Sequence, residues 1–153
     1  MSIARAFMIL ALAFALLPVG CKKDDDSPSS PGTTGIPEAL VGTWTLQSAT
    51  VNGQQTDLAI VFSWVDGSES ATIKVEANGA YTYAEYNGAA EMLYTSGGTI
   101  TVSGTNFTIT VNSENGQAVP ARELFAGTYA VAGNTLALTI ASQFGPVVVT
   151  ATK

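Results

Sequence analysis

The sequence predicts an all-β fold, an antiparallel up-and-down meander β-barrel of about eight to ten strands, preceded by a signal peptide and a disordered tether. Three observations predict it: apolar residues alternate with period two from residue 38 onward, short Gly/Asn turn pairs interrupt the alternation, and no convincing helical periodicity occurs in residues 38–153. About nine sequential strands in a twisted sheet tend to curl and close, because closure removes unpaired edges. The sequence therefore predicts one barrel domain across residues 38–153.

The composition excludes several classes of function. The 153 residues include 46% hydrophobic and 12% charged residues, with a net charge of −6. Phosphate binding needs clustered Lys and Arg, so a nucleic-acid partner is not expected. The chain has no histidine and one cysteine, Cys21, which leaves out the usual general base, the zinc cluster and the intramolecular disulfide. We expect no catalytic residue, no bound metal and no cofactor.

Residues 1–20 have the form of a signal peptide. One positive charge at Arg5 precedes the run AFMILALAFALL, which is too short to span a bilayer. The sequence LPVGC that follows, ending at Cys21, resembles a bacterial lipobox, with Pro18 where Leu is usual. The resemblance implies cleavage before Cys21 and its acylation, including palmitate, and so an anchor in the bacterial outer membrane. The alternatives are a secretory signal with an unrelated cysteine and a buried hydrophobic helix.

Residues 21–37 form the lipidated cysteine and a tether. The segment KKDDDSPSSPGTTGIP lacks apolar periodicity and, as a flexible coil of sixteen residues, would reach about 20–25 Å. Its CKKDDD start resembles the surface-export signal of Bacteroidota lipoproteins, which implies exposure on the cell surface. The alternative is a solvated charge run that keeps the tether extended.

The turns of the domain predict which strand residues face each other. We expect strands near 43–51, 71–77, 80–86, 89–95, 99–103, 106–112, 127–132, 135–141 and 146–152. The predicted connections are three-residue loops at 77–79 and 96–98, two-residue turns at Asn87-Gly88, Gly104-Thr105 and Gly133-Asn134, and a longer connection at 141–146. All of these registers place apolar residues on one interior face.

Two segments interrupt the strand pattern. The first, from Leu58 to Trp64, is apolar throughout and fits a further strand, a short helix or a flap. The second, from Pro120 to Gly127, begins with proline and ends with glycine, so one or two helical turns are plausible.

The first strand carries a motif, Gly42-x-Trp44, that resembles the lipocalin signature. Gly permits close approach of the chain to the barrel floor, and Trp closes that end with a large apolar body. The hairpin GTYAVAGNTLAL, which starts at Gly127, is similar to the penultimate hairpin of bacterial lipocalin-like lipoproteins. The sequence departs from true lipocalins in its last strand, where Lys153 stands in place of the Arg that stacks on the Trp. The resemblance, from residue 40 to 153, implies a floor formed by Gly42 and Trp44 and a ligand pocket above it.

The interior face predicts the candidate ligand-binding residues, which combine an apolar lining with hydroxyl groups. They are Tyr81, Tyr83, Glu85, Met92, Tyr94 and Tyr129. An eight-stranded barrel either fills with side chains or holds one small ligand, and both interpretations stay open. The acid among them, Glu85, either reaches solvent, which is the ordinary interpretation, or fixes a polar ligand head at the mouth.

Other acids give no catalytic or metal pattern. The predicted register places Glu85 inside and Glu91 outside, so these carboxylates do not converge as glycosidase acids must. Asp66 and Glu69 lie in a polar loop without EF-hand spacing. We expect a non-catalytic, lipid-anchored carrier of a small apolar or amphipathic ligand. The alternative is a solid barrel that binds a protein or glycan through its exterior or through residues 58–64.

Overall fold

The computed structural model describes residues 35–153. The predicted signal peptide, Cys21 and residues 22–34 of the predicted tether lie outside the described residues. In chain order the elements are η1 (Glu38–Leu40), β1 (Gly42–Val51), β2 (Gln54–Thr56), α1 (Leu58–Phe62), β3 (Ser70–Val75), β4 (Ala80–Tyr86), β5 (Met92–Ser103), β6 (Asn106–Glu114), β7 (Gln117–Ala132), β8 (Thr135–Ser142) and β9 (Gly145–Thr152).

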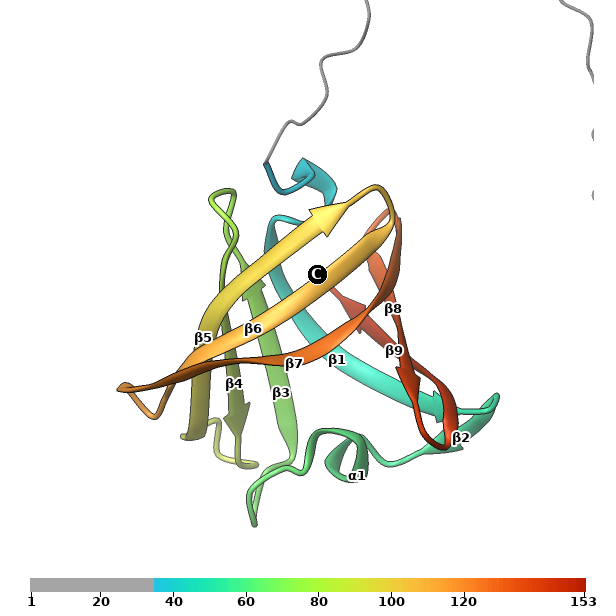
Figure 1. Ribbon diagram of the computed structural model, residues 1–153. Helices are drawn as coiled ribbons and strands as arrows, with labels where there is room; N and C mark the ends of the chain where they lie inside the picture. The colour runs from blue at the N-terminus through green and yellow to red at the C-terminus, as the bar shows by residue number, and fades with distance from the viewer. Residues whose placement is uncertain (1–34) are drawn as a thin grey trace, which may run out of the picture. The chain divides into compact units, whose positions relative to one another are not determined.

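The strands form a closed antiparallel barrel, as predicted (Figure 1). Each strand from β3 to β9 pairs with the next, and β1 closes the barrel by pairing with both β3 and β9. The short β2 pairs with the last three residues of β1. Eight strands therefore make the wall, and one turn of helix, α1, lies across the end that is lowest in Figure 1.

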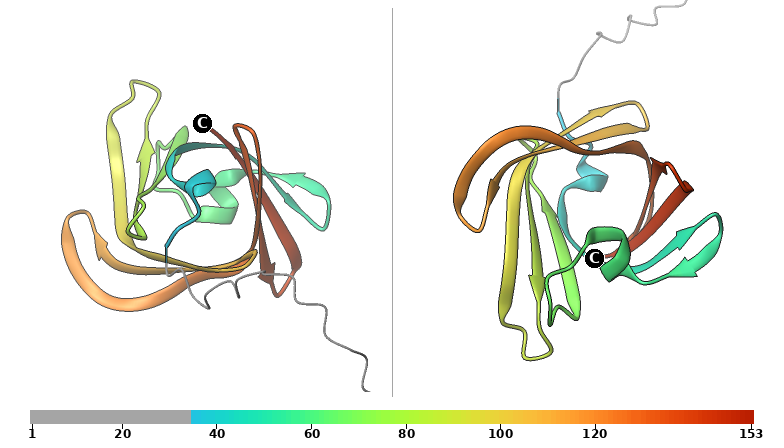
Figure 2. Two further views of the ribbon diagram at one scale, coloured as in Figure 1. Left: turned by 90° about the horizontal axis from the view of Figure 1, so that it is seen from above. Right: turned by 60° about the horizontal axis from the view of Figure 1, so that its bottom comes forward.

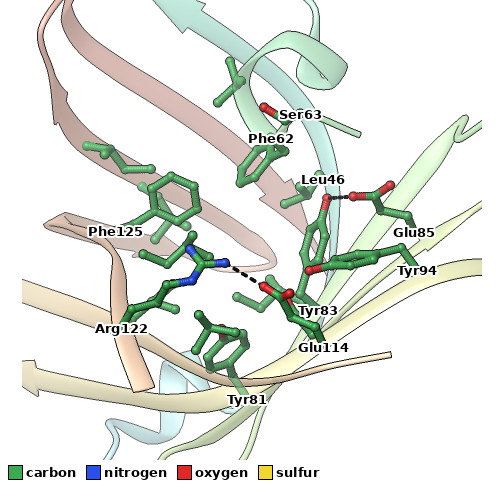
Figure 3. Close-up of a pocket in the computed structure, with 18 of the residues that line it drawn as sticks. Leu46, Phe62, Ser63, Tyr81, Tyr83, Glu85, Tyr94, Glu114, Arg122 and Phe125 are labelled. Atoms are coloured by element: carbon green, nitrogen blue, oxygen red, sulfur yellow. Dashed lines mark hydrogen bonds and ion pairs between the residues drawn. The ribbon is translucent and has the colours of Figure 1, made fainter. Parts of the chain in front are cut away.

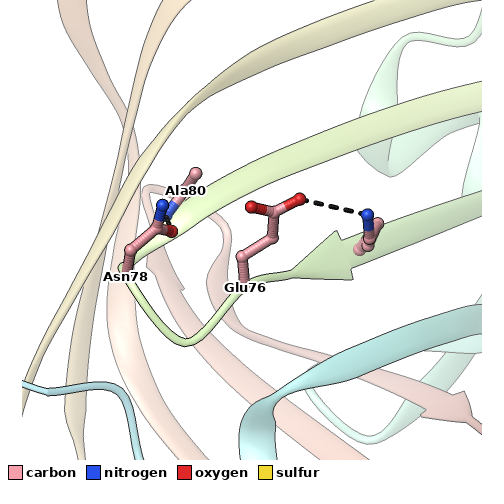
Figure 4. Close-up of polar contacts among 4 residues, drawn as sticks. Glu76, Asn78 and Ala80 are labelled. Atoms are coloured by element: carbon pink, nitrogen blue, oxygen red, sulfur yellow. Dashed lines mark hydrogen bonds and ion pairs between the residues drawn. The ribbon is translucent and has the colours of Figure 1, made fainter.

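Most of the predicted turns are confirmed. The predicted loop at 77–79 forms between β3 and β4. There the Asn78 side chain accepts a hydrogen bond from the backbone N–H of Ala80 at 2.8 Å, and Lys74 pairs with Glu76 at 3.0 Å (Figure 4). The turns at 104–105 and 133–134 also produce the predicted registers. The β8–β9 register is as predicted too, but its connection is a two-residue turn, Gln143-Phe144, so the longer connection expected at 141–146 is wrong. The confirmed pairs are Ile73–Tyr83, Val75–Tyr81, Ile100–Ile109, Val102–Phe107, Tyr129–Leu138, Val131–Leu136, Leu138–Val149 and Ile140–Val147.

The prediction for the β4–β5 region is wrong. No two-residue turn forms at Asn87, and residues 87–91 make a longer loop. In this loop the side-chain oxygen of Asn87, Oδ1, accepts hydrogen bonds from the backbone N–H groups of Ala89 and Glu91. The predicted loop at 96–98 is also absent, and β5 continues through both glycines. At Gly98 a Cβ would collide with the carbonyl oxygen of Thr110, at a bulge where the register of β5 against β6 shifts. These glycines therefore permit close approach of two strands rather than a turn.

The predicted helical turns at 120–127 are wrong as well, because β7 runs unbroken from Gln117 to Ala132. Pro120 is tolerated in β7 because the hydrogen-bond ladder between β6 and β7 is interrupted at this point. Val111 pairs with Arg122 and Ser113 pairs with Ala118, and Pro120 lies in the irregular stretch between these two pairs. The long, bulged β7 curves around the wall of the barrel (Figure 2).

The segment from Leu58 to Trp64 takes the short-helix form among the three that the sequence allowed. Asp57 caps α1 by accepting a hydrogen bond from the N–H of Ala59 at 2.9 Å, and Ser63 ends it in the left-handed conformation at φ 52°. No side chain of α1 is fully buried. The helix thus covers one end of the barrel, and its Leu58, Val61 and Phe62 side chains pack, partly buried, against the core.

The opposite end is closed by the Gly-x-Trp motif. Trp44 is fully buried and its Nε1–H donates to the carbonyl oxygen of Leu40 at 2.8 Å. Lys153 places its Nζ 4.4 Å from the Trp44 ring centroid and donates to the carbonyl oxygen of Ala39 at 3.2 Å. Gly42 adopts φ 135°, and a Cβ there would lie 2.9 Å from Cε of Lys153. The lysine therefore covers the tryptophan where true lipocalins have arginine, and the glycine makes room for it.

Candidate functional site

The barrel contains a cavity of about 490 Å³ between α1 and the strands (Figure 3). Aromatic and aliphatic side chains form most of its lining, and the polar side chains come from β4, β5, β6 and β7 and from Ser63, which ends α1. The lining residues are Leu46, Val61, Phe62, Ser63, Val65, Ile73, Tyr81, Tyr83, Glu85, Tyr94, Ser96, Phe107, Ile109, Val111, Glu114, Arg122, Leu124, Phe125, Leu138 and Ile140.

The structure brings four of the six predicted binding residues together at this cavity: Tyr81, Tyr83, Glu85 and Tyr94. The other two do not line it. Met92 is 60% exposed, so its predicted place inside the barrel is wrong: a bulge at Leu93 of β5 pairs Met92 with Tyr86 and turns it to the outer face.

Tyr129, the sixth predicted residue, packs partly buried against the core away from the cavity lining. Its hydroxyl donates to the carbonyl oxygen of Gly104 at 3.2 Å. This hydroxyl therefore has a structural partner within the barrel wall.

Glu85 is only 2% exposed, which makes the solvent interpretation wrong. Its carboxylate accepts hydrogen bonds from the N–H of Val65 at 2.9 Å, the hydroxyl of Ser68 at 2.8 Å and the hydroxyl of Tyr83 at 3.1 Å. Two of these donors belong to the loop that follows α1. Glu85 thus fastens this loop, residues 63–69, which we call the mouth loop, to the barrel wall. Hydrogen bonds to a charged acceptor are about twice as strong as neutral ones.

An ion pair lies on the polar side of the cavity: a guanidinium nitrogen of Arg122 approaches a carboxylate oxygen of Glu114 at 2.6 Å (Figure 3). The sequence analysis predicts neither residue as part of the site. It places Arg122 in a segment, 120–127, that is expected to form helical turns, and it ends the strand before Glu114 at residue 112. The pair Asn115-Gly116 is the signal that could have extended that strand: it forms the two-residue turn between Glu114 and Gln117, with both residues at positive φ, 48° and 76°.

Aromatic rings from four elements, α1, β4, β5 and β7, meet beside the short helix. Phe62 of α1 stacks on Tyr83 with ring centroids 5.9 Å apart and meets Phe125 of β7 edge-on at 5.7 Å. Tyr94 meets Tyr83 edge-on at 6.4 Å. Through Phe62 the short helix therefore contributes directly to the cavity wall.

Burial raises the pKa of three tyrosines. For Tyr83 the neighbouring Glu85 carboxylate raises the pKa further. For Tyr94 burial is again the largest cause and Glu114 the next. For Tyr81 burial raises the pKa, while the Ser96 side chain opposes part of the rise. All three phenols are therefore held neutral around the cavity.

The sequence profile of the lipocalin-like domain family matches residues 40–119, more than half of the chain. The protein belongs to the lipocalin-like domain family. The match includes the floor motif at Gly42 and Trp44 and the strands that carry most of the polar cavity residues.

A search of curated protein sequences finds no match to this lipocalin-like protein. Among solved structures, it is similar to the crystal structure of Echinococcus granulosus fatty-acid-binding protein 1, with 14% sequence identity and a TM-score of 0.40. That alignment covers 76% of this chain and 98% of the other.

The remaining acids of this lipocalin-like domain do not form a second site. Glu91 is exposed and accepts a hydrogen bond from the side-chain amide of Asn87 at 2.9 Å, on the outside of the barrel away from Glu85. Within residues 35–153 no cluster of three or more His, Cys, Asp or Glu side chains could hold a metal ion. None of the helices in this part of the chain has the length and hydropathy of a membrane-spanning segment.

Proposed function

We propose that this lipocalin-like protein is a non-catalytic binding protein that holds one small apolar or amphipathic molecule inside its barrel. The observation that carries the proposal is the cavity of about 490 Å³ with a mainly apolar lining. Cavities of about 300–1,000 Å³ with a few polar groups are typical of small-molecule sites. The volume argues against the alternative of a solid barrel.

Binding of an uncharged fluorescent probe, N-phenyl-1-naphthylamine, tests this proposal. We expect saturable binding of one probe per chain. Leu138 lines the cavity from β8, so Leu138→Trp should project a larger ring into it and weaken probe binding at least about tenfold. The control is Thr139→Trp on the next residue, which faces outward because side chains alternate along a strand.

The two variants make the result decisive once circular dichroism shows that both are folded. Absence of saturable binding, or equal binding by the Leu138→Trp variant, would contradict a ligand site inside the barrel. Native mass spectrometry of the protein from its natural host, before and after delipidation, should then reveal the mass of the bound compound.

We further propose that acyl chains on Cys21 anchor the protein to the bacterial outer membrane. The support is the lipobox-like sequence LPVGC, and the CKKDDD run supports export to the cell surface. Cys21→Ser should abolish palmitate labelling and move the protein from the membrane to the soluble fraction. Continued membrane association of this variant would contradict the anchor, and protease treatment of intact cells tests surface exposure.

A second candidate function, binding of a protein or glycan partner through residues 58–64, has one observation in its favour. Ile60 in this segment is 74% exposed. Ile60→Ser leaves the cavity lining intact and should reduce partner capture if this candidate is correct, whereas unchanged capture would count against it.

A further inference from the structure

The Tyr81 hydroxyl is a buried donor on a side chain that lines the cavity. The residue is 3% exposed, and its oxygen is shielded from solvent and has no partner at hydrogen-bonding distance among residues 35–153, although the Ser96 side chain lies near enough to lower the pKa of Tyr81. Figure 3 places Tyr81 on the same side of the cavity as Glu114 and Arg122. Because most buried polar side-chain atoms in proteins are partnered, this hydroxyl offers a hydrogen bond to an acceptor atom in the cavity.

The charged groups of the cavity are already matched. Glu114 neutralises Arg122, and Glu85 takes three hydrogen bonds from the protein. The charged residues of the lining are these two carboxylates and one guanidinium, so their formal sum is −1. A negatively charged head group would compete with Glu114 for Arg122 and would also meet Glu85, whereas a positively charged head would compete with Arg122 for Glu114; the side chains of this ion pair are 56% and 32% exposed.

The tyrosines are subject to the same negative potential. The carboxylate of Glu85 raises the pKa of Tyr83, and that of Glu114 raises the pKa of Tyr94, in both cases after burial as the larger cause. Two phenols whose pKa is raised, those of Tyr83 and Tyr94, thus line the space where a ligand head would lie. An anionic head would encounter the same two carboxylates.

We propose that the barrel selects an uncharged amphiphile, whose head carries an oxygen that accepts a hydrogen bond from the Tyr81 hydroxyl. A hydroxyl or carbonyl oxygen on an apolar chain or ring system has this chemistry. The apolar body would lie against Phe62, Phe125 and Leu138, which line the rest of the cavity. This inference rests on the proposed function and names the ligand class that the same cavity takes.

Competition among ligands that share a ten-carbon chain tests the head group alone. Displacement of N-phenyl-1-naphthylamine from the full chain is measured at pH 7.5 with 1-decanol below its solubility limit, and with decanoate and decylammonium below their critical micelle concentrations. We expect decanol to bind at least about tenfold more tightly than either charged compound. Equal or tighter binding of decanoate or decylammonium would overturn the proposal.

Two variants assign the effect to the cavity residues. Tyr81→Phe should weaken decanol binding about fivefold, which corresponds to the loss of one hydrogen bond. Tyr129→Phe is the matched control, because that hydroxyl bonds Gly104 away from the cavity. Glu114→Gln leaves Arg122 without its carboxylate and should strengthen decanoate binding about fivefold or more.

The outcomes separate this inference from the function on which it rests. If the probe does not bind, or binds the Leu138→Trp variant equally well, the cavity itself is refuted as a ligand site. If the probe binds in the cavity but Tyr81→Phe leaves decanol affinity unchanged, the proposed function stands and the head-group selection is refuted.

Discussion

Lys153→Met tests how the floor of the barrel is held. The substitution keeps an apolar side chain of similar length against Trp44 but removes the ammonium group, which lies 4.4 Å from the ring centroid. A cation–π contact at an exposed site contributes about 0.5–1 kcal/mol. The hydrogen bond from Nζ to the carbonyl oxygen of Ala39, at 3.2 Å, adds about 0.5 kcal/mol because water competes for it. The expected loss in the free energy of unfolding is therefore about 1–1.5 kcal/mol.

Equilibrium urea unfolding followed by tryptophan fluorescence measures this loss. Lys153→Arg should retain most of the stability, since a guanidinium also stacks on an aromatic face. Lys74→Met is the matched control: it removes a lysine whose partner, Glu76, is similarly exposed, and such surface pairs contribute about 0–1 kcal/mol. A Lys153→Met variant as stable as the wild-type protein would refute the role given to this lysine, as would a loss no larger than that of the control.

Three further predictions concern the wall, the mouth and pH. Gly98→Ala should destabilise the barrel by about 1–3 kcal/mol in the same urea assay, because its Cβ meets the carbonyl oxygen of Thr110; an unchanged midpoint would contradict the close approach. Glu85→Ala should cost about 2–3 kcal/mol and speed hydrogen exchange at the N–H of Val65, whereas retained protection would show that the mouth loop is held by other contacts. The pKa of Tyr83 is raised in the folded protein, so the folded protein keeps a proton that the unfolded chain loses above pH 10. The free energy of unfolding should therefore fall as pH rises above 10, by about 1.4 kcal/mol per pH unit for this tyrosine. Tyr83→Phe should reduce that slope, and phenolate absorbance at 295 nm should show fewer ionised tyrosines in the folded than in the unfolded protein; a slope equal in both proteins would contradict the assignment.

The parts of the fold that were predictable are those where local turn chemistry has one solution. Asn78-Gly79 and Gly133-Asn134 each allow one loop that keeps the apolar faces together, and both registers are confirmed. Gly98 was misassigned because a glycine signals either a turn or a close approach of strands, and the carbonyl oxygen of Thr110 that decides the matter is distant in sequence.

The candidate site followed the same division. Tyr81, Tyr83 and Glu85 were predicted to face inward because their strand pairs with β3 in the expected register. Tyr94 was also placed correctly, since the real register differs from the predicted one by an even number of residues and so preserves its face. The bulge beside Met92 adds one residue and reverses its face, and the alternation of sequence alone carries no sign of it.

The position of η1 and Lys153 at one end of the barrel, with α1 at the other, has a practical consequence (Figures 1 and 2). Both ends of the described chain meet at the closed floor, so a surface coupled through either of them leaves the opposite end, which α1 covers, directed outward. On the proposed function, coupling through a C-terminal tag to a sensor surface should preserve access of small molecules to the cavity.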